Sequence, residues 1–420
     1  MQDTSSGSDP RPAGPLEGVK VLDLTSVIMG PSATQALAAL GAQVIKVESA
    51  DGDNMRHVGP MRHPGMGHIF LHGNHGKRSI VLDLKQPEGR EAALRLAGRS
   101  DVVVSNIRPQ ALARLGLDYE AVRERNLRVI HVTCCGFDQQ GPYAARPAYD
   151  DLIQGATGMP WLMQQYGAPE PCYAPVTLAD RVTGLHVVSA VTAALYARER
   201  TGRGQAVEVS MFEAMTQFVL ADHMAGHSFE PPLGPAGYPR LLTRHRRPYR
   251  TRDGYLCVLI YNDKHWRNFF AAIGEPERMA NDQRFASHAG RAANIEAVYE
   301  EVARLMAQRT TAQWRELLDR ADVPNMPVNS PEELLEDPHH RATGFIREVE
   351  HPTEGRLRMM GCPTRWSGTP PSGHTLPAPR LGEHSVAVLR EAGYSDAEIE
   401  AMLASGACSA PAAAPQEPAR

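Results

Sequence analysis

Asp180 is the side chain in this sequence that is best placed for covalent chemistry. It lies in the run 173–184, directly ahead of an apolar segment, 185–197, that predicts a helix. A carboxylate at such a place can cap the helix by accepting backbone N–H bonds, or it can act as an ionised nucleophile toward an acyl group. Because the positive end of a helix stabilises an anion, we expect the pKa of Asp180 to be low.

Several basic and polar side chains could bind an anionic substrate. Lys77 and Arg78 follow Gly76, and Asn106 and Arg114 lie further along the same half of the chain. Each could meet a phosphate, although each alone is more typical of a solvated surface group. A second basic region could receive a polyanion, a substrate carboxylate or the acidic surface of another subunit, and it consists of Arg240, Arg244, Arg246, Arg247, Arg250 and Arg252.

Patterns for metals and dinucleotides are missing. His223 and His227 are four residues apart, but no Glu lies between them as in the H-E-x-x-H pattern, so we predict no metal site. The turn 26–31 lacks the G-x-G-x-x-G spacing that brings a backbone close to a pyrophosphate, which argues against a dinucleotide dehydrogenase.

Composition narrows the class of protein. The chain has 420 residues, of which 42% are hydrophobic, so it can form a sizeable core and more than one domain. Its 44 basic and 48 acidic residues give a net charge of −4, which argues against nucleic-acid or membrane-surface partners. Six scattered cysteines form no disulfide or zinc pattern, and no apolar run approaches the roughly 20 residues that span a bilayer, so we expect a cytoplasmic protein.

Strands and helices alternate in the first third of the sequence. Short apolar runs predict buried strands, and helical patterns lie between them. This alternation predicts an α/β fold with a parallel sheet. The predicted strands are 19–24, 42–48, 79–84, 101–105 and 129–133, and the predicted helices are 32–41, 87–99 and 109–115.

The remaining sequence predicts a second domain and a return segment. A Pro- and Gly-rich connection precedes a strand at 254–260 and helical patterns at 266–273 and 294–318. Many prolines after residue 328 favour an extended strap. The predicted organisation is a disordered tail at 1–14, a large domain at 15–228 and 328–404, a small α+β domain at 229–327 and a disordered tail at 405–420.

Taken together, these segments resemble the class III coenzyme A transferase family, the carnitine and bile-acid (CaiB/BaiF) type that includes formyl-CoA transferase-like members. The resemblance runs from Pro15 to about Leu403. Its motifs are each weak, but they occur in the family's order: 15–24, Gly30-Pro31, 40–48, 76–84, 101–106, Tyr149-Asp150, Ala179-Asp180 with Gly184, 201–205, 326–329, Asp337-Pro338, His351-Pro352 and 378–384.

The resemblance implies a large Rossmann-like domain built from both chain ends, a small domain and an interlocked homodimer. It implies that Asp180 is the catalytic nucleophile, which forms a mixed anhydride with the acyl group of an acyl-CoA donor before CoA passes to a carboxylic acid acceptor. Coenzyme A would then be a substrate, with no tightly bound cofactor. The residues that correspond to coenzyme A contacts in relatives are Lys77, Arg78, Asn106 and Arg114.

Two other functions remain open. Racemases of the family carry His-Asp where this chain has Tyr149-Asp150, and a tyrosine with an ordinary pKa of about 10 is poorly suited to cycling a proton near neutral pH. We therefore expect the protein to catalyse CoA transfer rather than racemisation. We expect Tyr149 and Asp150 to contact the substrate. A non-catalytic CoA-binding protein would not need Asp180. Some relatives have a glycine-rich loop where this chain has the arginine-rich segment 241–252. We expect Arg246 and Arg247 in this segment to bind a substrate carboxylate.

Overall fold

The structure is a computed structural model that describes residues 14–371 and 376–411. The chain divides into two compact units, which are described separately. Among the described residues, the first unit contains 14–157, 175–218, 339–371 and 376–411, and the second contains 158–174 and 219–338. The predicted small domain, 229–327, lies wholly within the second unit, which also takes in segments on either side of it. The predicted tail at 1–14 falls outside the described residues except for its last position.

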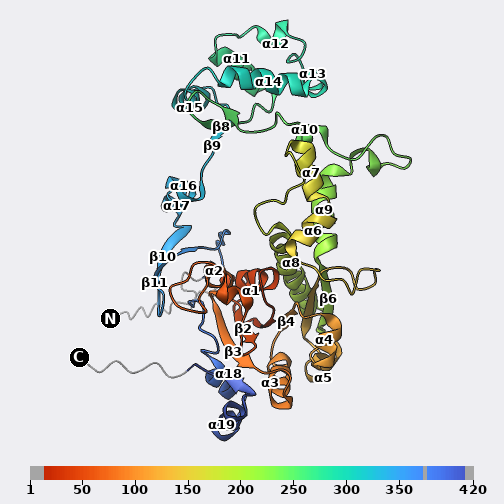
Figure 1. Cartoon of the computed structure of the whole chain (residues 1–420), viewed down its shortest axis with the longest axis vertical. Helices are drawn as coiled ribbons and strands as arrows, with labels where there is room; N and C mark the ends of the chain where they lie inside the picture. The colour runs from red at the N-terminus through yellow and green to blue at the C-terminus, as the bar shows by residue number, and fades with distance from the viewer. Residues whose placement is uncertain (1–13, 372–375, 412–420) are drawn as a thin grey trace, which may run out of the picture. The chain divides into compact units, whose positions relative to one another are not determined.

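A seven-stranded sheet forms the centre of the first unit (Figure 1). Neighbouring strands are parallel except at one edge, where β12 runs antiparallel to β3. The order β12-β3-β2-β1-β4-β5-β6 contains the 3-2-1-4-5-6 arrangement of the Rossmann fold, which confirms the predicted fold class. The strands are β1 (Lys20–Leu24), β2 (Gln43–Glu48), β3 (Lys77–Leu82), β4 (Val102–Ser105), β5 (Ile130–Cys135), β6 (Gln205–Ser210) and β12 (Cys408–Ser409).

Helices from both ends of the chain cover this sheet. Val102, Val103 and Val104 are completely buried, as expected for a parallel strand covered on both faces. The same core contains Val388 and Met402, so the two ends of the chain complete one domain as predicted. The helices are α1 (Met29–Ala39), α2 (His68–Asn74), α3 (Pro87–Gly98), α4 (Pro109–Arg114), α5 (Tyr119–Arg125), α6 (Asp150–Ala156), α8 (Leu178–Thr201), α18 (Ser385–Glu391) and α19 (Asp396–Ser405), with the short turn η1 (Asn54–His57).

Three sequence predictions about this unit were wrong. Residues 408–409 form β12, although 405–420 was predicted to be a tail, because the preceding helix α19 carries them to the open edge of β3. The strap is not simply extended, since it forms an antiparallel hairpin of β10 (Ile346–His351) and β11 (Gly355–Met360) as well as helices. The prediction that no apolar run approaches the length of a membrane span was also wrong, because α8 is long and apolar enough to cross a membrane by length and composition, although it packs on α1, β5 and β6.

The second unit has its own small core. Aromatic rings fill it. The ring centres of Trp266 and Phe285 are 5.1 Å apart, and the Phe269 ring stacks on the Trp314 ring. A three-stranded antiparallel sheet lies beside this core and consists of β7 (Tyr249–Arg250), β8 (Tyr255–Val258) and β9 (Asn325–Pro327). Its helices are α7 (Met159–Tyr166), α10 (Pro239–Leu242), α11 (Asp263–Ala272), α12 (Arg278–Asn281), α13 (His288–Ala293), α14 (Ile295–Met306), α15 (Thr311–Arg320) and α16 (Pro331–Leu335).

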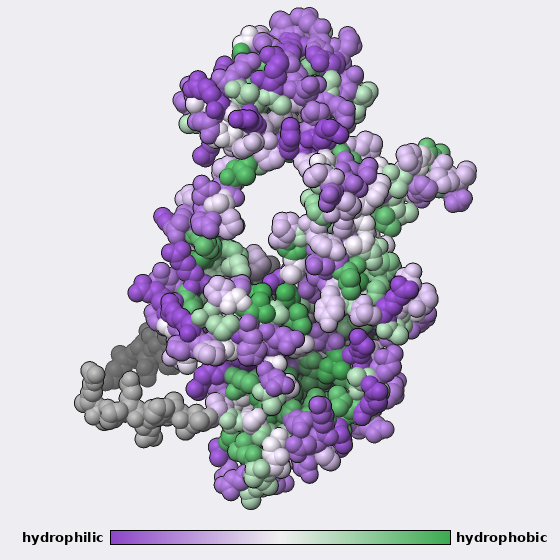
Figure 2. All heavy atoms as spheres, viewed as in Figure 1, coloured by the Kyte–Doolittle hydropathy of each residue, from purple (hydrophilic) through white to green (hydrophobic). Residues whose placement is uncertain are grey.

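Three elements complete the assignment: α9 (Met211–His223) begins in the first unit and ends in the second, η2 (Ala225–Ser228) follows it, and α17 (Pro338–Thr343) begins at the last residue of the second unit. The predicted helix 294–318 is two helices, α14 and α15, because the chain turns at Thr310, which caps α15. In the space-filling view, hydrophilic residues cover most of the helical part of the second unit, whereas hydrophobic residues form visible areas on the first (Figure 2).

Candidate active site

A cavity of about 370 Å³ lies where β1, β4 and β5 end in the first unit. In a sheet of this topology the strand order reverses between β1 and β4, and ligands bind in the crevice at the carboxyl ends of the strands at such a point. The turn after β1 supplies Ser26 and Val27, and the end of β4 leads to Asn106. The start of α6 and the first turn of α8 supply the remaining candidates, which are Tyr149, Asp150 and Asp180.

Asp180 lies inside the first turn of α8, because the helix begins at Leu178 rather than after the carboxylate as predicted. It is 9% exposed and lines the cavity. Its backbone N–H donates to Asp150 Oδ1 at 3.0 Å, so a second carboxylate takes the capping role. No donor in the described residues bonds to the Asp180 carboxylate, which leaves its oxygens available to a ligand.

The electrostatic surroundings of Asp180 contradict the predicted low pKa. Burial raises the pKa of Asp180 to about 7, and the neighbouring charge of Asp150 adds to this effect. The Arg181 side chain acts in the opposite direction but is outweighed. Desolvation therefore exceeds the stabilisation that we expected from the helix N-terminus.

The turn after β1 is strained and held by side chains. Val27 has a φ of 73°, an uncommon conformation for a β-branched residue. Asn106 accepts from the Ser26 N–H at 3.0 Å and donates to the Ser26 carbonyl at 2.8 Å. Asp53 accepts from the Val27 N–H at 3.1 Å. Asn106 thus fixes the backbone that forms one wall of the Asp180 cavity.

Lys77 occupies a different place from the one that its sequence motif suggested. It is completely buried, and its ammonium lies 3.0 Å from Asp23 and 2.8 Å from the Asn74 side-chain oxygen. Burial lowers the pKa of Lys77 to about 8, against the opposing effect of Asp23. Lys77 does not line the cavity, and its donors are engaged inside the core.

The other predicted contacts are dispersed. Arg78 pairs with Glu391 at 2.7 Å, and Arg114 is exposed at the end of α4 without lining the Asp180 cavity. Arg246 and Arg247 line a cavity of the second unit. Of the eight predicted partners of Asp180, only Tyr149, Asp150 and Asn106 share its cavity.

Sequence reasoning missed the cations that do reach this cavity. Arg108 and Arg146 both line it, and the Arg146 guanidinium lies 4.2 Å from the centre of the Tyr143 ring. Arg108 directly precedes α4 and comes soon after β4 ends. Its position beyond the carboxyl end of a central strand was a signal that could have identified it.

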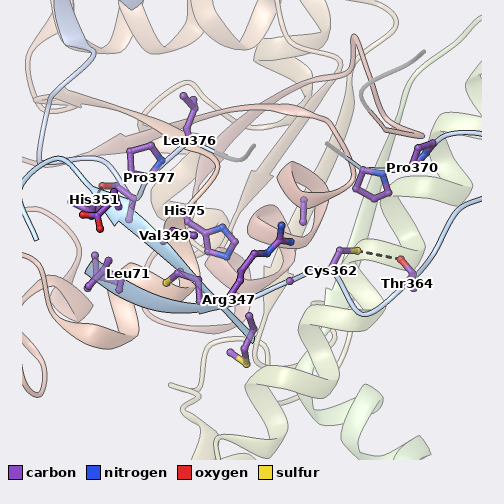
Figure 3. Close-up of a pocket in the computed structure, with 18 of the residues that line it drawn as sticks. Leu71, His75, Arg347, Val349, His351, Cys362, Thr364, Pro370, Leu376 and Pro377 are labelled. Atoms are coloured by element: carbon purple, nitrogen blue, oxygen red, sulfur yellow. Dashed lines mark hydrogen bonds between the residues drawn. The ribbon is translucent and has the colours of Figure 1, made fainter. Parts of the chain in front are cut away.

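A further cavity of about 400 Å³ in the first unit contains no predicted site residue (Figure 3). The hairpin β10–β11 and α2 contribute its mostly apolar walls. His75 and Arg347 lie next to each other in it (Figure 3). Burial lowers the pKa of His75 to about 4, so its ring is neutral near pH 7. We assign this cavity no catalytic role, because Asp180 is not among the residues that line it.

Comparison with known proteins decides the family. The model of CoA-transferase family III matches residues 16–385. This chain belongs to CoA-transferase family III. It is 34% identical over 414 residues to the formyl-CoA:oxalate CoA-transferases of Shigella sonnei and Escherichia coli O6:H1, covering 92% of this chain and 98% of each relative. Family membership makes the protein a CoA-transferase, and the family name implies CoA thioesters as substrates.

Solved structures that are similar to this chain have the same fold. A CaiB/BaiF family protein from Brucella suis is 32% identical and superposes with a TM-score of 0.76, covering 90% of this chain and all of that one. Rv3272 from Mycobacterium tuberculosis is 30% identical with a TM-score of 0.78, covering 90% of this chain and 99% of that one. The family resemblance that we drew from the sequence motifs is therefore confirmed.

Proposed function

We propose that this protein moves CoA between carboxylic acids through an anhydride on Asp180. The observation that carries the proposal concerns the Asp180 carboxylate. It is largely buried in the cavity where β1, β4 and β5 end, yet it accepts no hydrogen bond from the described residues. A nucleophile needs free lone pairs and protection from water, since water would hydrolyse an anhydride. A pKa of about 7 makes this carboxylate more basic than an ordinary aspartate, and therefore a stronger nucleophile once ionised.

The proposed reaction consists of four acyl-transfer steps. An Asp180 oxygen attacks the donor's thioester carbonyl, so that a C–O bond forms, the C–S bond breaks and CoA leaves as thiolate. The thiolate attacks the Asp180 carbonyl, which releases the donor acid and leaves an aspartyl-CoA thioester. The acceptor carboxylate displaces the thiolate to form a second anhydride. The thiolate then attacks the acceptor's carbonyl, giving the new acyl-CoA and restoring the Asp180 carboxylate.

Neighbouring residues receive positioning roles in this proposal. Asp150 holds the Asp180 backbone at 3.0 Å, and Gln154 donates to the other Asp150 oxygen at 2.7 Å. Tyr149 is 67% exposed at the mouth of the same cavity, where it can contact the acyl part. Asn106, which fixes the turn after β1, is the predicted coenzyme A contact that this cavity supports.

Acid identity, assembly and location also belong to the proposal. The names of the curated relatives point to small acids such as formate and oxalate as substrates.

We infer a homodimer, because Leu185 and Tyr196 of α8 are 71% and 66% exposed and would be covered by a second subunit. All six cysteines are free, which supports a reducing cytoplasm. Light scattering would test the dimer directly.

Trapping with hydroxylamine tests the reaction. The enzyme is incubated with hydroxylamine and each of a panel of acyl-CoA donors, which includes formyl-CoA, oxalyl-CoA and succinyl-CoA, and its peptides are measured by mass spectrometry. The wild type should acquire a hydroxamate at Asp180, and the Asp180→Asn variant should not. A wild type that shows no hydroxamate with any of a panel of acyl-CoA donors, but exchanges the α-hydrogen of a 2-methylacyl-CoA in deuterated water, would contradict transfer and favour a racemase.

A further inference from the structure

The second unit contains a cavity of about 440 Å³ whose charged lining residues are all cationic. Arg240, Arg246 and Arg247 line it, and neither aspartate nor glutamate does. No ion pair joins any of these three arginines to an acid in the described part of the chain. Three cations gathered at one concave site without acidic partners attract an anion.

Tyrosine side chains lie beside the arginines of this cavity. Arg240 and Tyr299 both line the cavity, the neighbouring Tyr299 side chain raises the pKa of Arg240, and the Arg240 guanidinium lies 5.4 Å from the centre of the Tyr261 ring. The Tyr166 hydroxyl donates to the Arg246 backbone carbonyl, so α7 is hydrogen-bonded to the chain at Arg246. These contacts restrict the backbone at Arg246 and the side chain of Arg240 before any ligand binds.

Apolar side chains form the remaining walls. Val258, Ile260 and Trp266 line the cavity, and Trp266 belongs to the buried aromatic core of the unit. Tyr249 is 7% exposed, and burial raises the pKa of its hydroxyl, so this ring stays uncharged. A ligand that fits must therefore carry its negative charge toward the arginines and an apolar portion toward these walls.

We propose that this cavity is a second ligand site that binds a short-chain dicarboxylate through Arg246, Arg247 and Arg240. Guanidinium groups bind carboxylates in a bidentate manner, and two separate carboxylates can engage more of the three cations than one can. The methylene groups between them would contact the apolar walls. The choice of a carboxylate over other anions rests on the proposed function, since acids are the substrates and products of that reaction.

Isothermal titration calorimetry with the full-length protein tests the site. The probes are succinate, acetate and inorganic phosphate, each at low and high salt. Succinate should bind the wild type and the Asp180→Asn variant equally. It should bind the Arg246→Ala/Arg247→Ala variant more weakly by at least about tenfold, because two charge-assisted contacts are lost. Binding should also weaken at high salt, since both arginines are exposed.

A matched variant controls for loss of charge alone. Arg267 and Arg315 are exposed on α11 and α15 of the same unit and do not line the cavity. The Arg267→Ala/Arg315→Ala variant should therefore bind succinate like the wild type. Circular dichroism of both double variants checks that they fold.

Three results would overturn the second site, and a fourth separates it from the proposed function. Equal succinate affinity for the wild type and the Arg246→Ala/Arg247→Ala variant overturns it, as does phosphate or acetate binding as tightly as succinate. Loss of succinate binding in the Asp180→Asn variant also overturns it, because the ligand would then occupy the Asp180 cavity. If the wild type forms no hydroxamate but succinate still binds through the arginines, the proposed function fails and the second site stands.

Discussion

The rate of the first acyl-transfer step should rise about tenfold between pH 6 and pH 8. The nucleophile is the ionised form of Asp180, whose pKa is about 7. A group with this pKa is about one-tenth ionised at pH 6 and about nine-tenths ionised at pH 8. The value of kcat/KM reports ionisation in the free enzyme, so it should follow this fraction. Rapid-quench measurement of CoA release over this pH range provides the assay.

Replacing Asp150 tests the origin of the pH dependence. Burial is the larger cause of the raised pKa and the charge of Asp150 is the second. The Asp150→Asn variant removes that charge and keeps an oxygen that can accept from the Asp180 N–H, now 3.0 Å from Asp150 Oδ1. The rising limb of kcat/KM should therefore move to lower pH.

Stability gives an independent measure of the same ionisation. The pKa of Asp180 rises from 3.8 to about 7 on folding, so the folded state holds the proton more tightly. Stability from this group is present below pH 4 and is lost as the pH rises through 7. A shift of about three pKa units corresponds to about 4 kcal/mol, which we reduce to about 2 kcal/mol because the carboxylate reaches a cavity open to water. The Asp180→Asn variant should gain this amount over the wild type between pH 4 and pH 8.

Hydrogen exchange in peptides of α8 is the suitable measurement, because the two units can unfold in separate steps. A kcat/KM that stays constant between pH 6 and pH 8 would refute the reasoning about Asp180. The same holds if the Asp150→Asn profile coincides with that of the wild type, since the neighbouring charge would then have no effect on the nucleophile.

Three further substitutions give distinct expectations. Lys77→Met should destabilise the first unit by about 3–5 kcal/mol in urea unfolding, because it leaves Asp23 buried without its cation, while KM for acyl-CoA changes little. Gly184→Ala should lower the free energy of unfolding by about 1–3 kcal/mol and slow transfer, because the new Cβ would lie 2.7 Å from the Ser32 hydroxyl of α1. Gly155→Ala on α6 is the control, because its new Cβ would meet open space, and it should leave stability and transfer rate unchanged or slightly improved. Asn106→Ala should raise KM for acyl-CoA about tenfold in steady-state kinetics, since the turn after β1 loses two hydrogen bonds, and an unchanged KM would contradict this expectation.

The parallel sheet was predictable because its strands are buried on both faces and read as apolar runs. Val102–Val104 is the clearest case, since every side chain in it is buried. Lys77 was misread because a lysine beside an arginine suggests a surface, while its partner, Asp23, is distant in the sequence. The start of β3 was therefore placed two residues late, at 79 rather than 77.

The candidate site was only partly predictable for a related reason. The helix N-terminus near Asp180 is visible in the sequence, but its burial and the approach of Asp150, thirty residues away, arise from the packing of α6 on α8. The sequence therefore indicated the correct residue and the wrong direction for its pKa. The arginines at 246 and 247 were recognised as a cluster, but only the fold shows that they line a cavity separate from the one that contains Asp180.

The pairing of β12 with β3 has a consequence for synthesis on the ribosome. Cys408 lies opposite Leu82, so one margin of the sheet stays open until more than three hundred further residues have been translated. Val388, Ile399 and Met402 join the same apolar core just as late. The nascent amino-terminal half must therefore wait with part of its interior uncovered, and it should depend on chaperones until the last helices emerge.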